Sequence, residues 1–502
     1  MKRLECLDGL RGVLAVYVLV GHMAPFSALP SWVLRPLSHG GAAVDVFFIL
    51  SGMVIVRSLE GCGYAARPFL IARAARIFPV YLAMLAAGVA VQALPVSFVA
   101  MPWIGPDSAA RDIWSHGWPA YWGVEIAAHL TMTHGLFPAG ALPDVWVSFL
   151  GAAWSLSTEW QFYVLALLWG RARPGIGGMA AALLAMAAAG LAWDVMAPDT
   201  WRFSRAFLPN KAHYFALGVA SAGLGVFRTR DVSARFSRTG ASLTGLGRSI
   251  LVMARAGRAI GCGQAGSFRE GLAIRPAASV PSRGCAAPDG PVEPGHDDLR
   301  TDVAPKRSVG GSYPGPRLVE PDRDDVRTAV APKRSLGASY LDAQEGEPVC
   351  GGARGEGQDR TIDGGIMLFA AVLMAVLALC LIRGGGGKLL PPLVWTACLA
   401  AQTRPDMLKF VAAPLRARWV QYLGAISYPI YLANEPIQKA LGVALARWVD
   451  GDGWVFSALW VPGAVLLPIA AAAWLHRTVE RPGIQRGKAL ARHGVTTIGV
   501  RS

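Results

Sequence analysis

Two ionisable residues, Arg11 and His22, lie near the two ends of an apolar segment that runs from Leu7 to Met23. A charge inside hydrocarbon costs at least ~2.5 kcal/mol, so an ionisable residue in a membrane helix is by default a functional hypothesis. On a helix the two would be about 16 Å apart along the axis, within a quadrant of the same face. A neutral imidazole, with a pKa near ~6.5, can take a proton from a hydroxyl, so His22 is a candidate general base. The alternative is a packed histidine and an arginine that only anchors the helix.

Two carboxylates lie within other apolar segments. Asp45 is expected to pair with a cation or with a histidine, and His22 is the expected partner. In that position Asp45 would orient the ring, or would instead cap the start of a helix. Glu159 is suited to holding a substrate hydroxyl or balancing Arg11, with a structural ion pair as the alternative. Gly52 predicts close helix packing.

Arg73 and Arg76 are three residues apart and share one helical face at the membrane surface. Two guanidinium groups in this arrangement suit a phosphate or pyrophosphate, through bidentate hydrogen bonds. The alternative is that they only fix the orientation of the neighbouring helix.

Long apolar segments recur along the chain, which is 53% hydrophobic and 16% charged over 502 residues. A helix needs about 20 apolar residues to cross ~30 Å of hydrocarbon. We therefore predict an all-α fold, a polytopic membrane helix bundle of about ten transmembrane helices. The predicted spans are residues 9–26, 41–57, 78–95, 146–169, 177–196, 208–226, 366–382, 389–403, 420–441 and 456–475.

The basic residues lie mainly in short connections between these spans. The net charge is +15, but residues 228–363 hold 20 Lys and Arg against 17 Asp and Glu. The basic connections fall on one side if the N-terminus is cytoplasmic. We predict a multi-pass protein of the cell inner (plasma) membrane, with both termini cytoplasmic, membrane lipid around it and no nucleic-acid partner. The seven cysteines form no CxxC pair and no Cys/His cluster, so we expect neither a disulfide framework nor a metal site.

The outward loop from about residue 95 to 144 is rich in Trp, Pro, Gly and His. It predicts a short re-entrant or surface helix from Trp122 to His129. His129 and His134 lack evident partners, so we expect both to be exposed to water, with the lining of an outer vestibule as the alternative.

Residues 228–364 are rich in Gly, Pro, Arg and Asp and show no sustained apolar period. Burial there cannot offset the entropy of ordering, so we predict a disordered cytoplasmic insertion. Residues 300–313 and 327–340 are a tandem near-repeat. A foreign genetic insertion is the preferred explanation, and a regulatory or docking tail is the alternative.

Six motifs occur in a fixed order outside this insertion. They are Asp8-Gly-Leu-Arg11 with His22, Val44 to Gly52, Arg73 to Pro79, Trp154 to Tyr163, Ile426 to Leu432, and Val479 to Pro482. Together they resemble the acyltransferase-3 family of integral membrane O-acyltransferases.

The resemblance implies transfer of an acyl group, commonly acetyl from acetyl-CoA, to a carbohydrate hydroxyl of an envelope or exported glycan. The family's Arg-x10-His pair maps onto Arg11 and His22, and its arginine motif onto Arg73 and Arg76. One departure is the segment Asn434-Glu435-Pro436, where family members often carry a histidine, so no acid-base role is expected there. The long insertion is the other departure.

On this basis we expect an O-acyltransferase that uses acyl-CoA as donor and a carbohydrate as acceptor. His22 would take the acceptor proton or assist acyl transfer, Arg11 would bind or orient the donor, and Asp45 would orient His22. Direct attack by the acceptor is preferred, and a transient acyl-enzyme is the alternative. Arg73 and Arg76 would hold the CoA phosphates.

Residues 1–227 and 365–482 would then be two parts of one membrane domain, and residues 483–502 a basic cytoplasmic tail. The alternatives are a transporter of glycan or lipid precursors and a catalytically inactive member of the family. The sequence leaves the oligomeric state open.

Overall fold

The computed structural model describes residues 4–224 and 358–496, apart from positions 38, 107, 109, 112, 113, 115, 116, 173, 174, 385 and 450. These residues all belong to one compact unit, Met1–Arg238 with Ser335–Ser502. The predicted insertion falls almost wholly outside the described residues, so its disorder stays a prediction. The structure begins a helix at Gln358, inside the predicted end of the insertion.

The described residues fold as helices, with no strand among them and one isolated β-bridge between Pro138 and Phe203. Before the insertion the helices are α1 (Glu5–Met23), α2 (Ser31–Leu37), α3 (Gly40–Gly61), α4 (Ala66–Gln92), α6 (Trp122–Leu130), α7 (Trp154–Ala172), α8 (Gly175–Met196) and α9 (Leu208–Ala222). After it they are α11 (Gln358–Ile382), α12 (Leu390–Thr403), α13 (Lys409–Arg416), α14 (Arg418–Ala425), α15 (Ser427–Trp448), α16 (Gly453–Leu475) and α17 (Arg481–Thr496).

Each predicted span overlaps one or more of these helices, and the chain is an all-helical, multi-pass membrane protein. Within the described ranges, six helical segments are long and apolar enough to cross a membrane. They are Glu5–Phe26, Ser31–Gly61, Ala66–Gln92, Gly175–Met196, Gly364–Ile382 and Gly453–Ala491. Helices α9 and α12 have only 15 and 14 residues, and a crossing needs about 20. The count of ten spans and the orientation of the termini therefore stay predictions.

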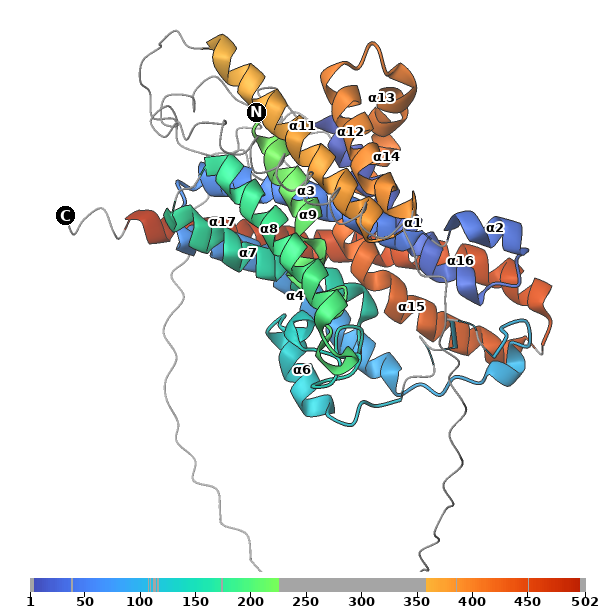
Figure 1. Cartoon of the computed structure of the whole chain (residues 1–502). Coiled ribbons are helices and arrows are strands. Elements are labelled where there is room, and N and C mark those ends of the chain that lie inside the picture. The colour runs from blue at the N-terminus through green and yellow to red at the C-terminus, as the bar shows by residue number, and fades with distance from the viewer. Residues whose placement is uncertain are drawn as a thin grey trace, which may run out of the picture. The chain divides into compact units, whose positions relative to one another are not determined.

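Helix α1 lies inside the bundle, packed against α3, α12, α13, α14, α15 and α16 (Figure 1). Two glycine contacts bring it close to α13 and α14. A Cβ at Gly9 would overlap the carbonyl oxygen of Leu415, and one at Gly424 would overlap that of Asp8. Because the backbones touch here, only glycine fits, which explains the glycines that flank Arg11.

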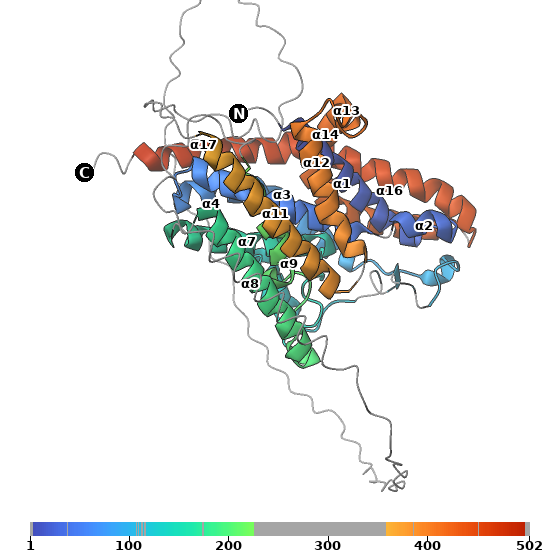
Figure 2. The same cartoon turned by 45° about the horizontal axis from the view of Figure 1, so that its top comes forward.

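Helix α3 packs along α9, which lies beside α8 and α11 (Figure 2). A Cβ at Gly52 would lie 2.5 Å from the carbonyl oxygen of Phe215, and one at Gly218 would overlap that of Ile49. The predicted close packing at Gly52 is therefore confirmed. This contact brings the polar residues near the start of α9 to Asp45.

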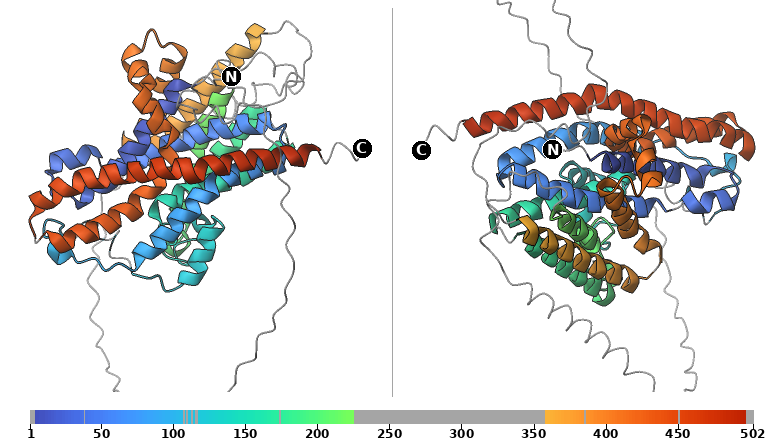
Figure 3. Two further views of the ribbon diagram at one scale, coloured as in Figure 1. Left: turned by 180° about the vertical axis from the view of Figure 1, so that it is seen from behind. Right: turned by 90° about the horizontal axis from the view of Figure 1, so that it is seen from above.

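Helices α16 and α17 are joined by a π-helical turn, η9 (His476–Glu480), and form one rod along the side of the bundle (Figure 3). The rod packs against α4, where Gly483 and Gly487 allow close approach to Ala75. The predicted basic tail is thus helical up to Thr496. The turn η9 places Glu480 beside α4.

The loop between α4 and α7 contains α6, which confirms the predicted short helix. The expected exposure of His129 and His134 is wrong: both are fully buried, with their rings stacked 4.1 Å apart. Their Nε2 atoms contact the carbonyl oxygens of Val145 at 3.0 Å and Ala153 at 3.2 Å, respectively. Burial lowers the pKa of His134 to about 4 and holds the pKa of His129 well below its ordinary value.

Candidate active site

A cavity of about 90 Å³ lies between α1, α3, α4, α7 and α15. Four of the six predicted site residues line it: Arg11, Arg73, Arg76 and Glu159. The sequence separates these residues by up to 148 positions, and the bundle brings them together. Three guanidinium groups line the cavity, and guanidinium groups suit an anionic ligand.

Arg11 is buried with 6% of its surface exposed. Its Nη2 donates a hydrogen bond to Oγ of Ser427 at 3.1 Å, and that hydroxyl donates to the carbonyl oxygen of Gly424 at 2.9 Å. The guanidinium group is therefore held by the first turn of α15 and is not a surface anchor. This excludes the alternative that Arg11 merely reaches from the helix end to the membrane surface.

Arg73 and Arg76 lie within α4, whereas the sequence places them before a span that begins at residue 78. The helix starts earlier because residues 66–77 consist largely of Ala, Leu, Ile and Arg, which favour helix. The Arg73 guanidinium is 5.7 Å from the ring centres of both Phe69 and Tyr163. Two aromatic rings thus flank the Arg73 guanidinium group at the cavity wall.

Arg76 has a different environment, because its Nη2 lies 3.6 Å from Oε1 of Glu480. The other oxygen of Glu480 is 2.7 Å from Nδ1 of His476. A carboxylate on the rod of α16 and α17 thus balances part of the charge on Arg76. The two arginines of the motif therefore have different neighbours: aromatic rings of α4 and α7 beside Arg73, and a carboxylate of the rod beside Arg76.

Glu159 accepts hydrogen bonds at Oε1 from the hydroxyls of Ser51, at 2.7 Å, and Tyr163. Within the described part of the chain it forms no ion pair, so the structural ion pair considered for it does not form. Among the described residues that line the cavity, Glu159 is the one with a carboxylate. Serine and tyrosine hydroxyls fix its orientation.

His22 lies outside this cavity, near the other end of α1. Its Nδ1 is 2.8 Å from Oδ1 of Asn434, which is fully buried in α15. Asn434 is one turn beyond Tyr431, which lines the cavity. Helix α15 therefore connects His22 to the site at the Arg11 end.

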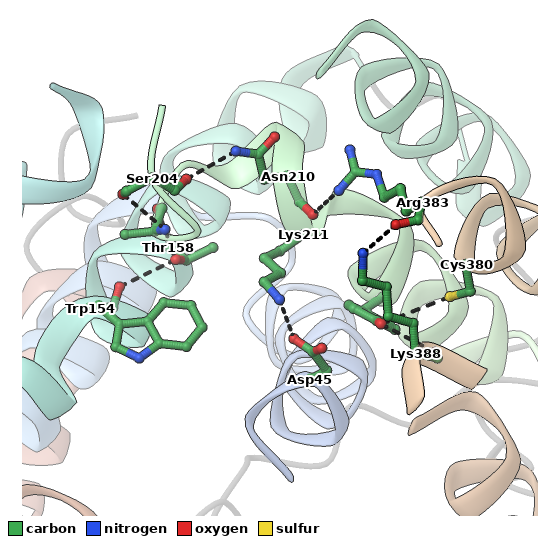
Figure 4. A network of polar contacts seen from close by, with 11 residues as sticks. Asp45, Trp154, Thr158, Ser204, Asn210, Lys211, Cys380, Arg383 and Lys388 are labelled. Atoms are coloured by element: carbon green, nitrogen blue, oxygen red, sulfur yellow. Dashed lines mark hydrogen bonds and ion pairs between the residues drawn. The ribbon is translucent and has the colours of Figure 1, made fainter. Parts of the chain in front are cut away.

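The expected pair between Asp45 and His22 is wrong. Asp45 forms an ion pair with Lys211 of α9, Nζ to Oδ1 at 2.7 Å (Figure 4). The side chains are only 10% and 17% exposed. The broader expectation that Asp45 pairs with a cation is met, but the cation comes from α9 because α3 packs closely along that helix.

The Asp45–Lys211 pair belongs to a polar network between α3, α9 and α11 (Figure 4). Arg383 donates to the carbonyl oxygen of Asn210 at 2.6 Å, and Lys388 donates to that of Arg383 at 2.6 Å. These contacts join the parts of the chain on either side of the insertion. Asp45 therefore lies in a network of polar contacts with α9, which the sequence did not predict.

No acid-base role was expected for the segment Asn434-Glu435, yet it contacts both α1 and the turn that leads into α7. Glu435 Oε2 accepts the backbone N–H of Ala152 at 2.8 Å, in the 3-10 turn Gly151–Ala153 that leads into α7. An adjacent asparagine and glutamate within a predicted span are costly in a membrane, and this signal could have identified them. Lys211 gives the same signal near the start of α9.

The family model of an acyltransferase domain, that of the acyltransferase-3 family, matches residues 4–260. The match includes all six predicted site residues, whereas α15 lies beyond it. No curated protein and no solved structure matches the chain significantly. The match covers just over half of the chain and agrees with the six ordered motifs, and on this evidence the chain belongs to the acyltransferase-3 family of membrane acyltransferases.

Proposed function

We propose that the protein transfers an acyl group, in the first instance acetyl, from acyl-CoA to a hydroxyl of a cell-envelope or exported glycan. The observation that carries the proposal is the cavity in which Arg11, Arg73 and Arg76 converge. CoA is a polyanion, and guanidinium groups bind phosphates through paired hydrogen bonds. Family membership supports acyl transfer as the reaction.

The donor would bind with its phosphates toward the arginine cavity. Arg11 and His22 are about 16 Å apart along α1, and the thioester of acyl-CoA lies far from its phosphates along a flexible arm. One helix could therefore contact both ends of the donor. Glu159 would balance the guanidinium charge while the cavity is empty.

His22 would act as general base on the acceptor. The hydroxyl oxygen attacks the thioester carbonyl, the imidazole takes the hydroxyl proton, and the C–S bond breaks to release CoA thiolate, which the imidazolium then protonates. We favour direct attack because the described part of the cavity wall offers no cysteine and its serines are not beside His22. Asp45 is left out of this step because its partner is Lys211.

In this proposal the arginine cavity opens toward the cytoplasm, where acyl-CoA is made, and the acceptor approaches from the other side of the inner membrane. Both termini are then cytoplasmic, which agrees with the distribution of basic connections.

The test is the O-acyl content of envelope glycan, measured by NMR in cells that produce the wild-type protein or His22→Ala at equal levels. The proposal predicts O-acyl groups with the wild type and their loss with the variant. Equal acylation in the two strains would contradict it.

A further inference from the structure

The Asn434 side chain is fully buried, and its hydrogen bonds determine which way its amide points. Nδ2 donates to the carbonyl oxygen of Tyr431 at 2.6 Å and lies 3.4 Å from that of Ile430. Carbonyl oxygens only accept hydrogen bonds, so the amide nitrogen must face them. The amide oxygen, Oδ1, therefore faces His22.

An amide oxygen also only accepts, so the hydrogen in the 2.8 Å contact belongs to Nδ1 of His22. A neutral imidazole carries one N–H, and its other nitrogen has the lone pair. With the hydrogen on Nδ1, the lone pair is on Nε2.

We propose that Asn434 is a positioning residue that holds His22 in the Nδ1–H tautomer and so makes Nε2 the atom that takes the acceptor proton. This rests on the proposed function of His22, although the tautomer itself can be observed without catalysis. An asparagine fixes the ring without placing a charge on it. A carboxylate in the same position would instead stabilise the imidazolium and make the histidine a stronger base.

The next residue strengthens this assignment. Glu435 accepts the N–H of Ala152 in the 3-10 turn Gly151–Ala153, which leads directly into α7. The dipeptide thus ties α15 to α1 through Asn434 and to α7 through Glu435. Glu435 also interacts electrostatically with His22 and with Lys439. Glu435 and Lys439 are retained in every variant used below, so each comparison changes only the named side chain.

The direct test is the ¹⁵N spectrum of histidine-labelled protein in detergent, with the His22 signals assigned from their loss in His22→Gln. At a pH where His22 is neutral, we expect a protonated Nδ1 and an unprotonated Nε2 in the wild type. In Asn434→Leu, which lacks the acceptor, the signals should indicate a mixture of tautomers. A wild-type spectrum with the hydrogen on Nε2 would overturn the proposal.

Kinetics give a second readout. Asn434→Leu should lower kcat by about 10–100-fold with little change in KM for acyl-CoA. Asn434→Asp should restore much of kcat and shift the apparent pKa in the pH profile of kcat upward by about 1 unit or more. An unchanged pH profile in active Asn434→Asp would overturn the positioning role.

Gln438→Leu is the matched control. Gln438 is equally buried one turn further along α15 and donates to the carbonyl oxygens of Leu19 and Ala464, without contacting His22. It should reduce stability but leave the tautomer and the pH profile unchanged, and a tautomer change in this variant would count against a specific effect of Asn434. If the wild type transfers no acyl group, the proposed function fails, while the spectrum still decides the tautomer.

Discussion

Arg11 and His22 share one helix, but the two ends of α1 are built from different kinds of contact. Around Arg11, charged side chains from α1, α4 and α7 converge on a cavity. His22 instead meets a neutral, fully buried amide of α15. The first arrangement gathers charged groups that suit an anionic donor, and the second places a neutral hydrogen-bond partner beside one ring nitrogen.

This difference predicts that the two ends of α1 have separate functions, which mutations can distinguish. Substitutions at the Arg11 end should change the affinity for the donor, and substitutions at the His22 end should change turnover. An interaction made equally in the bound and transition states alters KM, whereas one made only in the transition state alters kcat.

His22→Gln should have the largest effect, since loss of a general base reduces turnover by about 10²–10⁴-fold. The measurement is kcat for acyl transfer by purified protein, with KM for acyl-CoA from the same data. A large rise in KM with unchanged kcat would place His22 in donor binding and remove the distinction between the two ends.

Substitutions in the Asp45–Lys211 pair should have the next largest effect, and the effect should be on stability because the pair supports the fold. Asp45→Asn leaves a buried lysine without its carboxylate and should destabilise the protein by about 3 kcal/mol. The double variant Asp45→Asn/Lys211→Met should recover most of this stability in thermal unfolding and retain acyl transfer. A double variant that is stable but inactive would return Asp45 to the catalytic role predicted from the sequence.

Arg73→Gln should raise KM for acyl-CoA by about 10–100-fold, because hydrogen bonds to charged groups contribute about 1.5–3 kcal/mol. Arg76→Gln should have a smaller effect, because Glu480 already balances part of its charge. Steady-state measurement of KM for acyl-CoA in both variants tests whether Arg73→Gln has the larger effect. Equal effects would show that the Glu480 contact does not limit what Arg76 offers.

The smallest predicted effect is a pH dependence of stability that arises from His134, which lies near the His22 end of α1. Because burial holds the pKa of His134 at about 4, below ~6.5 in the unfolded chain, the unfolded state binds more protons as the pH falls. The neutral, buried His134 therefore makes its full contribution to the free energy of unfolding above pH ~6.5. At pH ~5.5 this free energy is lower by about 1.4 kcal/mol.

His134 contacts the carbonyl oxygen of Ala153, next to the N–H that Glu435 accepts. Acid should therefore loosen the loop that supports the His22 end. Thermal unfolding at pH ~7 and ~5.5 should show a drop in Tm that is smaller in His134→Gln. An identical drop in the variant would assign the pH dependence to other groups.

The sequence predicted the positions of the helices well, because the length of an apolar run determines where a membrane helix can form. It also identified the chemical types at the site, since Arg11 and Glu159 are costly in such runs and Arg73 and Arg76 share one helical face. It did not predict their partners. Which helix lies beside α3 depends on the glycine contacts with α9, so Asp45 was assigned to His22 and Lys211 was missed.

The same limit applies to Asn434. A comparison with the family motif treats it as a missing histidine, and only the packing of α15 against α1 shows that its amide reaches the ring of His22. The separation between these two residues is 412 positions, so no local pattern relates them.

The most direct test of the division along α1 is the binding of CoA to purified protein in detergent, measured by calorimetry for the wild type, Arg11→Gln and His22→Gln. We predict that Arg11→Gln weakens binding by about tenfold or more, while His22→Gln binds as the wild type does. Equal binding by Arg11→Gln and the wild type, or a loss confined to His22→Gln, would contradict the account.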